Sequence, residues 1–112
     1  MSMEGLPQFE NSLEELKFYI ATAPIELEKE YVRGSGASWA LCAATRLSVI
    51  MGFLEYSIED GLLTPEQIDS ANSKLQEAIG YLEKLKEDYP RTGDTVPEER
   101  KKGMIERFNI LQ

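Results

Sequence analysis

The segment from about residue 37 to residue 60 predicts a helix that is apolar on almost every side, and this limits the possible folds more than any other feature. At about 100° per residue, one broad face of this helix carries Trp39, Ala43, Leu47, Ile50, Leu54 and Ile58. Leu41, Val49 and Phe53 point in other directions. A helix of this kind is typically central and packs against neighbours on several sides.

The same segment has one sustained polar stripe. It consists of Ser38, Thr45, Ser48, Gly52, Glu55 and Glu59. The first four of these residues are small and uncharged, and small residues let a neighbouring helix approach closely. The stripe therefore does not exclude packing on this side of the helix.

The chain before this segment predicts a helix from about residue 12 to residue 33. Ser12 and Glu15 have the spacing of a capping box. One helical face then carries Leu13, Leu16, Ile20, Leu27 and Tyr31. Pro24 interrupts the pattern, and it either kinks the helix or begins a second one; we favour a break. Gly34-Ser35-Gly36 then predicts a flexible turn.

The third helix, expected over residues 64–89, has the clearest start in the chain. Thr64 can serve as the N-cap, Pro65 follows it, and Gln67 completes a capping box. A heptad-like spacing follows through Ile68, Ala71, Leu75, Ala78, Leu82, Leu85 and Tyr89. This pattern suits either a seam within one bundle or a coiled coil between two chains. Pro90 ends the helix.

The last part of the chain predicts an exposed connection over residues 90–97 and a short helix over about 96–111. Thr95 and Glu98 have capping-box spacing. An apolar patch is formed by Met104, Ile105, Phe108 and Leu111. Gly103 weakens this helix by about 1 kcal/mol relative to alanine. Of the four helices, it is the one most dependent on packing or on a partner.

Together these segments predict an all-α fold: an antiparallel bundle of three long helices and a short C-terminal helix, with the apolar helix in the middle. The short connections make consecutive helices antiparallel neighbours. The 112 residues form one domain, since the chain has no room for a second. Residues 1–10 are expected to be an N-terminal extension.

The sequence favours a cytoplasmic protein. Cys42 is the single cysteine, so no intramolecular disulfide can form, and the first ten residues do not resemble a secretory signal. The longest apolar run, residues 39–54, contains Arg46 and is shorter than the roughly 18–20 residues of a membrane span. We therefore expect no membrane association.

Composition argues against an enzyme and against cofactor or metal binding. The chain has no histidine, which is the commonest general base and zinc ligand near neutral pH. Glu55 and Glu59 share a helix face, but a solvated helix end explains them better than a cation site. The glycines at 34 and 36 lack the rest of a phosphate-binding motif. We expect no catalytic residue, no cofactor and no metal.

Charge is distributed unevenly. The chain has 20 acidic and 12 basic residues and a net charge of −8. Residues 91–112 contribute five basic and four acidic side chains, a net charge of +1, so the first 90 residues carry −9. The total argues against direct nucleic-acid binding. The C-terminal helix is expected to pack on an acidic surface of its own chain or of a second subunit, or to engage another protein.

Eight residues are candidates for protein binding. They are aromatic, basic or apolar residues of the central and C-terminal helices: Trp39, Arg46, Phe53, Arg100, Lys101, Met104, Arg107 and Phe108. Arg46 has two interpretations. Its stem packs on neighbouring rings while its head reaches water or a glutamate of the first helix, or it anchors an interface, where arginine and tryptophan are enriched.

The function favoured by these observations is a non-catalytic helical module that binds another protein as an inhibitor, adaptor or regulatory subunit, and that self-associates as a homodimer. Its support is the apolar surplus of the central helix and the marginal C-terminal helix. One alternative is an acidic mimic of nucleic acid that blocks a DNA-binding or defence protein. A second is an apolar small-ligand binder with a pocket beside the central helix.

Overall fold

The computed structural model describes residues 8–33, 36–91 and 93–111 and contains four helices in this part of the chain. They are α1 (Ser12–Arg33), α2 (Gly36–Glu59), α3 (Pro65–Asp88) and α4 (Glu98–Glu106). No strand is present in these residues. The expected all-α fold with three long helices and a short last one is confirmed. Most of the predicted N-terminal extension, and part of the turn at residues 34–36, lie outside the described residues.

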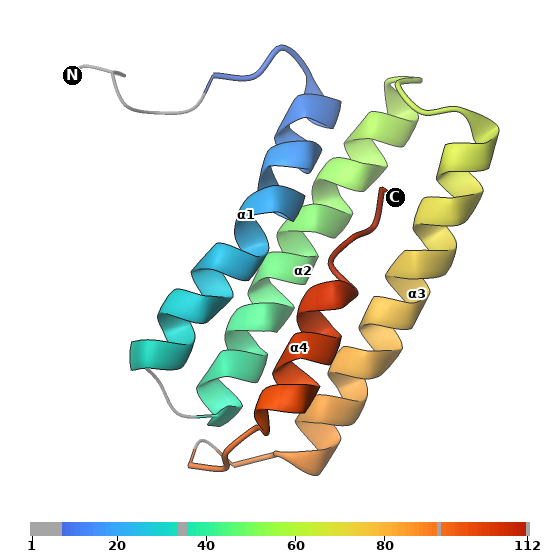
Figure 1. The fold of residues 1–112 in the computed structure, drawn as a ribbon. Helices are drawn as coiled ribbons and strands as arrows, with labels where there is room; N and C mark the ends of the chain where they lie inside the picture. Colours follow the sequence, from blue (N-terminus) through green and yellow to red (C-terminus); the bar gives the residue numbers. More distant parts are fainter. Residues whose placement is uncertain (1–7, 34–35, 92, 112) are drawn as a thin grey trace.

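The three long helices lie side by side in one layer, in the order α1, α2, α3, and α4 packs on one face of this layer beside α3 (Figure 1). Consecutive long helices run in opposite directions, and α2 is in the middle, as predicted. The Cα atoms extend only 17 Å along the shortest principal axis. The molecule is therefore a thin layer with a cover on one side.

The core lies between this layer and α4. The face predicted for α2 is buried at Trp39, Ala43, Leu47, Ile50 and Leu54, while Ile58 is half-buried. On α3, five members of the heptad pattern are buried: Ala71, Leu75, Ala78, Leu82 and Leu85. The seam of α3 therefore packs within its own chain, and the alternative of a coiled coil between two chains is not needed to explain it.

The helix α1 differs from the prediction at Pro24 and at its start. It runs without a break through Pro24, so the favoured break is wrong. The buried Ala23 and Leu27 lie on one face on either side of the proline. Packing of that face stabilises the continuous helix, which overcomes the cost of an interior proline, about 3 kcal/mol.

The N-cap of α1 is Asn11 and not Ser12, because the Glu14 backbone N–H donates to Asn11 Oδ1 at 3.0 Å. Ser12 is used elsewhere: its hydroxyl donates to Asp60 Oδ2 at 3.1 Å and accepts a hydrogen bond from the buried Ser57 at 3.3 Å. The side chain of Ser12 thus joins the start of α1 to the end of α2. The predicted capping box of Ser12 and Glu15 does not form.

The turn between α2 and α3 follows the sequence signals closely. Gly61 has a positive φ of 69°. The N–H of Gly61 donates to Ile58 and that of Leu62 to Ser57, the two bonds of a Schellman motif. Thr64 then caps α3 in a complete capping box with Gln67. The predicted capping box of Thr64 and Gln67 is confirmed.

The helix α4 is shorter than the expected 96–111 and lacks the predicted capping box. Its N-cap is Pro97, with no side-chain hydrogen bond. A residue that precedes proline is disfavoured in the helical region, so the buried Val96 stays outside the helix. After Glu106 the chain continues in tight turns that bury both Phe108 and Ile110. A continued helix would place these two side chains about 200° apart.

The helix α2 meets the length and composition criterion for crossing a membrane over Ser38–Glu59, 22 residues. Central packing between α1 and α3 accounts for part of this apolar character. Two of its large apolar side chains remain exposed, however: Leu41 and Tyr56, each at 57%. The helix therefore has more apolar surface than its own chain covers.

Candidate functional site

Five of the eight predicted binding residues lie on α4 or just after it, and they hold α4 against the rest of the chain. Arg100 forms an ion pair with Asp88 of α3 at 3.2 Å, and its guanidinium lies over the rings of Tyr81 and Tyr89 at 5.6 and 5.7 Å from their centroids. Burial opposes the charge of Arg100, but hydrogen bonds with Tyr81 and Asp88 outweigh it, and the pKa is raised.

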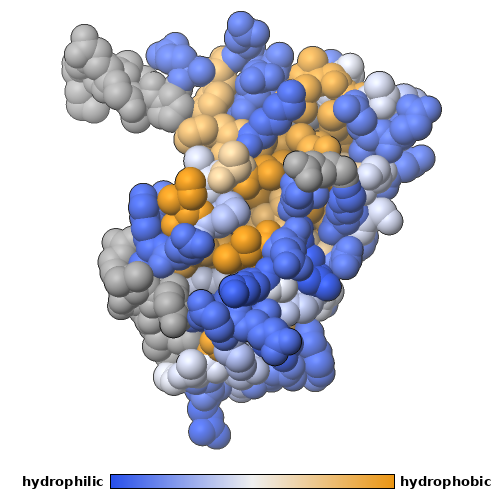
Figure 2. Space-filling model, viewed as in Figure 1, coloured by the Kyte–Doolittle hydropathy of each residue, from blue (hydrophilic) through white to orange (hydrophobic). Residues whose placement is uncertain are grey.

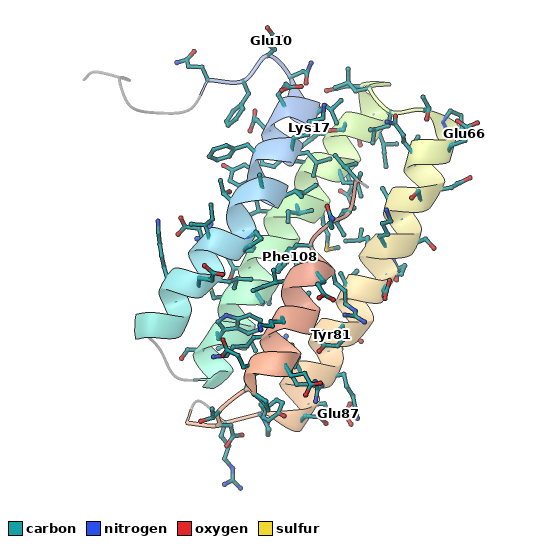
Figure 3. The ribbon with its side chains drawn as sticks, viewed as in Figure 1. Glu10, Lys17, Glu66, Tyr81, Glu87 and Phe108 are labelled. Atoms are coloured by element: carbon teal, nitrogen blue, oxygen red, sulfur yellow. The ribbon has the colours of Figure 1, made fainter. Side chains whose placement is uncertain are left out.

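Tyr81 is the centre of this attachment, and Figure 3 shows it on the part of α3 that faces α4. The Tyr81 hydroxyl donates to the Arg100 carbonyl at 3.0 Å, and Arg107 lies 4.2 Å from the ring centroid. Gly103 passes so close to the ring that a β-carbon there would overlap the hydroxyl. Gly103 lowers the helix propensity of α4, but its lack of a side chain permits the contact with Tyr81 that holds α4 on α3.

Lys101, Met104 and Phe108 form the inner side of the same attachment. Met104 and Phe108 are buried in the core, and Figure 3 labels Phe108 where α4 ends. Lys101 is also buried, at 6% exposure, with its ammonium 5.8 Å from the ring centroid of the buried Trp39. Burial lowers the pKa of Lys101, and Glu98 opposes this shift.

The C-terminal segment thus pairs with an acidic residue of α3 in its own chain, one of the arrangements that the charge distribution predicted. Arg107 adds a second ion pair, to Glu77 of α3 at 3.5 Å. Trp39 and the predicted residues of α4 are used within the chain. Their role in binding a partner stays a prediction.

The remaining two predicted residues, Arg46 and Phe53, lie between α1 and α2. Arg46 forms an ion pair with Glu26 of α1 at 3.7 Å, with about a third of each side chain exposed. This contact agrees with the first interpretation of Arg46, in which its head reaches a glutamate of the first helix. Phe53 stacks on Tyr19 with ring centroids 5.2 Å apart. Both residues therefore contribute to the contact between these helices.

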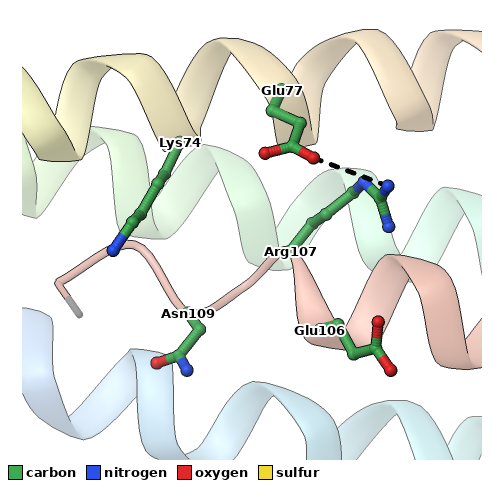
Figure 4. A pocket seen from close by; sticks show the side chains of 5 residues that line it. All are labelled: Lys74, Glu77, Glu106, Arg107 and Asn109. Carbon is green, nitrogen blue, oxygen red and sulfur yellow. Dashed lines mark ion pairs between the residues drawn. The ribbon is translucent and has the colours of Figure 1, made fainter.

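A polar pocket of about 390 Å³ lies where α3 faces the end of α4 (Figure 4). It is lined by Lys74, Glu77, Glu106, Arg107 and Asn109. Two acidic and two basic side chains balance each other here, and Arg107 already pairs with Glu77. The pocket has no net charge to select an ionic ligand.

An apolar furrow separates α1 from α4. It has a volume of about 180 Å³, and Ile20, Pro24, Ile105 and Phe108 line it together with Glu106 and Asn109. Figure 2 shows hydrophobic residues gathered between α1 and α4 on this face of the molecule. The furrow is small, and two of its four lining residues on the α4 side, Glu106 and Asn109, are polar.

The opposite face of the layer, which α4 does not cover, carries most of the polar stripe of α2. Ser48 is nine positions from Trp39, which is half a turn around α2, so it points away from the residue that α4 covers. We call this side of the molecule the open face. Its α2 residues are Leu41, Thr45, Ser48, Gly52 and Glu55, all of them exposed except the half-buried Gly52.

A groove of about 220 Å³ runs along the open face between α2 and α3. Its lining comes from both helices: Ala44, Leu47, Ser48, Met51, Ile79, Leu82, Glu83 and Lys86. Sequence reasoning did not identify Ala44, Met51 and Ile79 as site residues. The polar stripe of small residues on α2 was the available signal, because it marks the side on which a further helix can approach.

Aromatic side chains lie at the contact between α1 and α2. Phe9, Phe18, Tyr19, Phe53 and Tyr56 form a continuous chain of ring contacts with centroids 5.2 to 6.1 Å apart. Two of the rings remain accessible, Phe18 at 37% and Tyr56 at 57%, and Leu41 on α2 is also 57% exposed. Ile25 of α1 is 53% exposed as well, so the large exposed apolar residues are divided between α1 and α2.

Among the described residues, no group of three or more Cys, Asp and Glu side chains is arranged to hold a metal ion. Glu55 and Glu59 do not form such a group. The comparisons add no family assignment: no protein-family model, no curated protein and no solved structure matches this chain. Functional inference therefore rests on the surfaces of the molecule itself.

Proposed function

We propose that this chain is a non-catalytic protein-binding module that acts through helix–helix contacts at the open face and self-associates through them. The observation that carries the proposal is the incomplete cover of α2. Leu41 and Tyr56 of α2 are each 57% exposed, and a groove lined by Ala44, Leu47, Met51 and Ile79 lies beside the helix. An exposed apolar surface of this kind marks an interaction site.

Side chains of a docked helix are the proposed occupants of the groove, which has a volume of about 220 Å³. Its floor is made by Ala44, Leu47, Met51 and Leu82, and its borders by Glu83 and Lys86. Small residues beside it on α2 allow the axis of a docked helix to lie close to that of α2. A helix there would sit on the α2–α3 pair as α4 sits on the other side of the layer.

The test compares two arginine substitutions at exposed serines. Ser48→Arg places a long charged side chain on the open face, and Ser73→Arg makes the same change on an exposed position of α3 outside the groove. Each variant and the unmodified chain serve as bait in an extract of the native host, with an untagged copy of the chain added. Far-UV circular dichroism checks that all three baits are folded.

We expect the unmodified chain and Ser73→Arg to retain a protein at moderate salt, either the untagged copy or a host protein, and Ser48→Arg to retain none. Equal retention by all three baits would show that the open face is not the binding surface. Ionic strength separates this function from an acidic mimic of nucleic acid, whose complex weakens steeply with salt, whereas an apolar helix contact does not.

A further inference from the structure

We propose that α4 is a displaceable cover, and that the surface of α2 and α3 beneath it is a binding site for a short amphipathic helix of another protein. This surface lies on the side of the layer opposite the open face, so the inference goes beyond the proposed function and does not depend on it. The contacts of α4 show what the surface binds, and the weaknesses of α4 show how a partner displaces it.

The contacts of α4 define what this surface accepts. Tyr81 lies against Gly103 and leaves no space for a β-carbon at that position. Asp88 and Glu77 of α3 each form an ion pair with an arginine of the C-terminal segment, at 3.2 and 3.5 Å. Two side chains on the inner side of this segment are buried in the core: Met104 and Phe108. A helix that binds here therefore carries a small residue between two basic residues and apolar side chains on its inner side.

Three features weaken the attachment of α4. Lys101 is 6% exposed, and this burial disfavours its charge and lowers its pKa. The N-cap residue, Pro97, makes no side-chain hydrogen bond, so no side chain caps the first turn of α4. The buried Nε of Arg107 has no hydrogen-bond partner among the described residues. The surface can therefore bind a better-matched helix more tightly than it binds α4.

The segment that connects α3 to α4 does not fix α4 by hydrogen bonds. In its described part, residues 90–91 and 93–96, Arg91 and Asp94 bond to each other at 2.9 and 3.0 Å, and no hydrogen bond reaches a helix. Release of α4 therefore breaks the contacts of the C-terminal segment and leaves those that join α1, α2 and α3.

A partner displaces α4 only by binding more tightly than a helix that is tethered to the surface. A short tether gives α4 an effective concentration of roughly 1 mM. A second copy of the chain offers the same α4 and has no advantage over it, so the occupant is a helix of another protein. Such a helix has an apolar residue in place of Lys101, over the ring of Trp39, and a capping residue in place of Pro97.

The first experiment measures the fluorescence anisotropy of labelled peptides mixed with the full chain. The probe has the sequence of residues 96–111 with Pro97→Ser and Lys101→Met. We expect saturable 1:1 binding of the probe, and about tenfold weaker binding of a peptide with the unchanged sequence. A third peptide adds Gly103→Ala to the probe. This change raises helix propensity but overlaps Tyr81, so we expect binding about tenfold weaker than that of the probe.

Two outcomes of the peptide experiment would overturn the inference. One is the lack of saturable binding by the probe. The other is equal binding by the probe and by the peptide with Gly103→Ala, because the bound helix would then not lie against Tyr81.

Two variants of the chain locate the bound probe. Arg100→Asp weakens the attachment of its own α4, and we expect it to bind the probe about tenfold more tightly, because a larger fraction of the chain is open. Ser48→Arg, on the open face, should bind the probe as the unmodified chain does. Circular dichroism monitors folding. Probe binding that is unchanged in Arg100→Asp, or lost in Ser48→Arg, would contradict binding beneath α4.

The second experiment needs no variant and follows amide hydrogen exchange of the unmodified chain at low urea concentrations. We expect the amides of α4 to open with a smaller free energy, and with a smaller dependence on urea, than those of α2 and α3. Equal values for the three helices would show that α4 leaves the layer only when the whole chain unfolds. That result would overturn the displaceable cover.

Discussion

Gly103 of α4 lies directly against the side chain of Tyr81 on α3, and a β-carbon at position 103 would overlap the Tyr81 hydroxyl and ring. The Tyr81 hydroxyl donates to the carbonyl of Arg100 at 3.0 Å, so the ring cannot move away without losing that bond. The position of α4 on the layer is therefore set by an absent side chain on one helix and an aromatic ring on the other.

The first prediction follows from this contact. Gly103→Ala is expected to destabilise the protein by about 1–2 kcal/mol, because the overlap with Tyr81 outweighs the helix propensity of alanine, about 1 kcal/mol. The free energy of unfolding is measured by urea denaturation. In a Tyr81→Ala background the overlap is gone, and the same substitution should stabilise the chain. A stabilising effect in both backgrounds would contradict the close packing.

The second prediction concerns Lys101, which is buried and has a lowered pKa because of its burial. Lys101→Met removes a buried charge and is expected to raise the free energy of unfolding by about 1 kcal/mol at pH 7. The native lysine releases its proton at a lower pH than the unfolded one. Native stability therefore rises with pH as the pH approaches the ordinary lysine value of 10.5.

The measurement for Lys101 is urea denaturation of both proteins at pH 7 and at a pH just below that ordinary value. The advantage of Lys101→Met should shrink at the higher pH, since both proteins share all other titrating groups. Lys102→Met, at an exposed position beside it, serves as the control and should show no such trend. An advantage that is constant or grows with pH would contradict the lowered pKa.

The third prediction concerns Pro24. The proline has no N–H for the carbonyl of Ile20 within the continuous helix α1. Pro24→Ala should restore that bond and stabilise the chain by about 1–3 kcal/mol, with an increase in helical circular dichroism. Pro24→Gly should gain about 1 kcal/mol less, because glycine is a poor helix former. Loss of stability in Pro24→Ala would show that proline contacts in the furrow outweigh the helix bond.

The fourth prediction concerns Arg46. Its ion pair with Glu26 is 3.7 Å long and a third exposed, and the buried Arg46 Nε has no hydrogen-bond partner among the described residues. Such a pair is worth at most about 1 kcal/mol. Arg46→Met should therefore leave the free energy of unfolding within about 1 kcal/mol of the original. Glu26→Gln, which removes only the charge of the partner, should have an effect of similar size.

The same Arg46 variant also tests its two interpretations. Retained stability together with loss of dimer or partner binding would assign it to an interface. Unfolding of Arg46→Met would mean that its contacts with α1 support the fold. Binding and stability that both remain unchanged would make it a surface side chain of little consequence.

Much of the fold could be predicted because local signals and packing agree in this chain. The apolar face of α2, the heptad pattern of α3, and the turn at Gly61 and Thr64 each follow from the spacing of side chains along one element. Contacts that decide between nearby alternatives could not be predicted in this way. Whether Asn11 or Ser12 caps α1 depends on Asp60 and Ser57, which are more than 40 positions away in the chain.

The candidate site was less predictable than the fold for the same reason. The basic character of the C-terminal helix indicated that it would meet acidic residues, but Asp88 and Glu77 as partners depend on how α4 lies across α3. The groove joins Ala44 and Met51 to Ile79, and the alignment of α2 with α3 follows from core packing. A sequence pattern identifies one face of a single helix. A groove is formed by two helices, and the pattern does not give their alignment.

Trp39, the single tryptophan, is 1% exposed, and a side chain of the last helix lies over its ring. Each helix of the chain packs mainly on the one that precedes it, so the layer can assemble in the order in which a ribosome releases it. Docking of α4 places the ammonium of Lys101 5.8 Å from the centroid of the indole ring. The fluorescence of Trp39 is therefore expected to report the docking of α4.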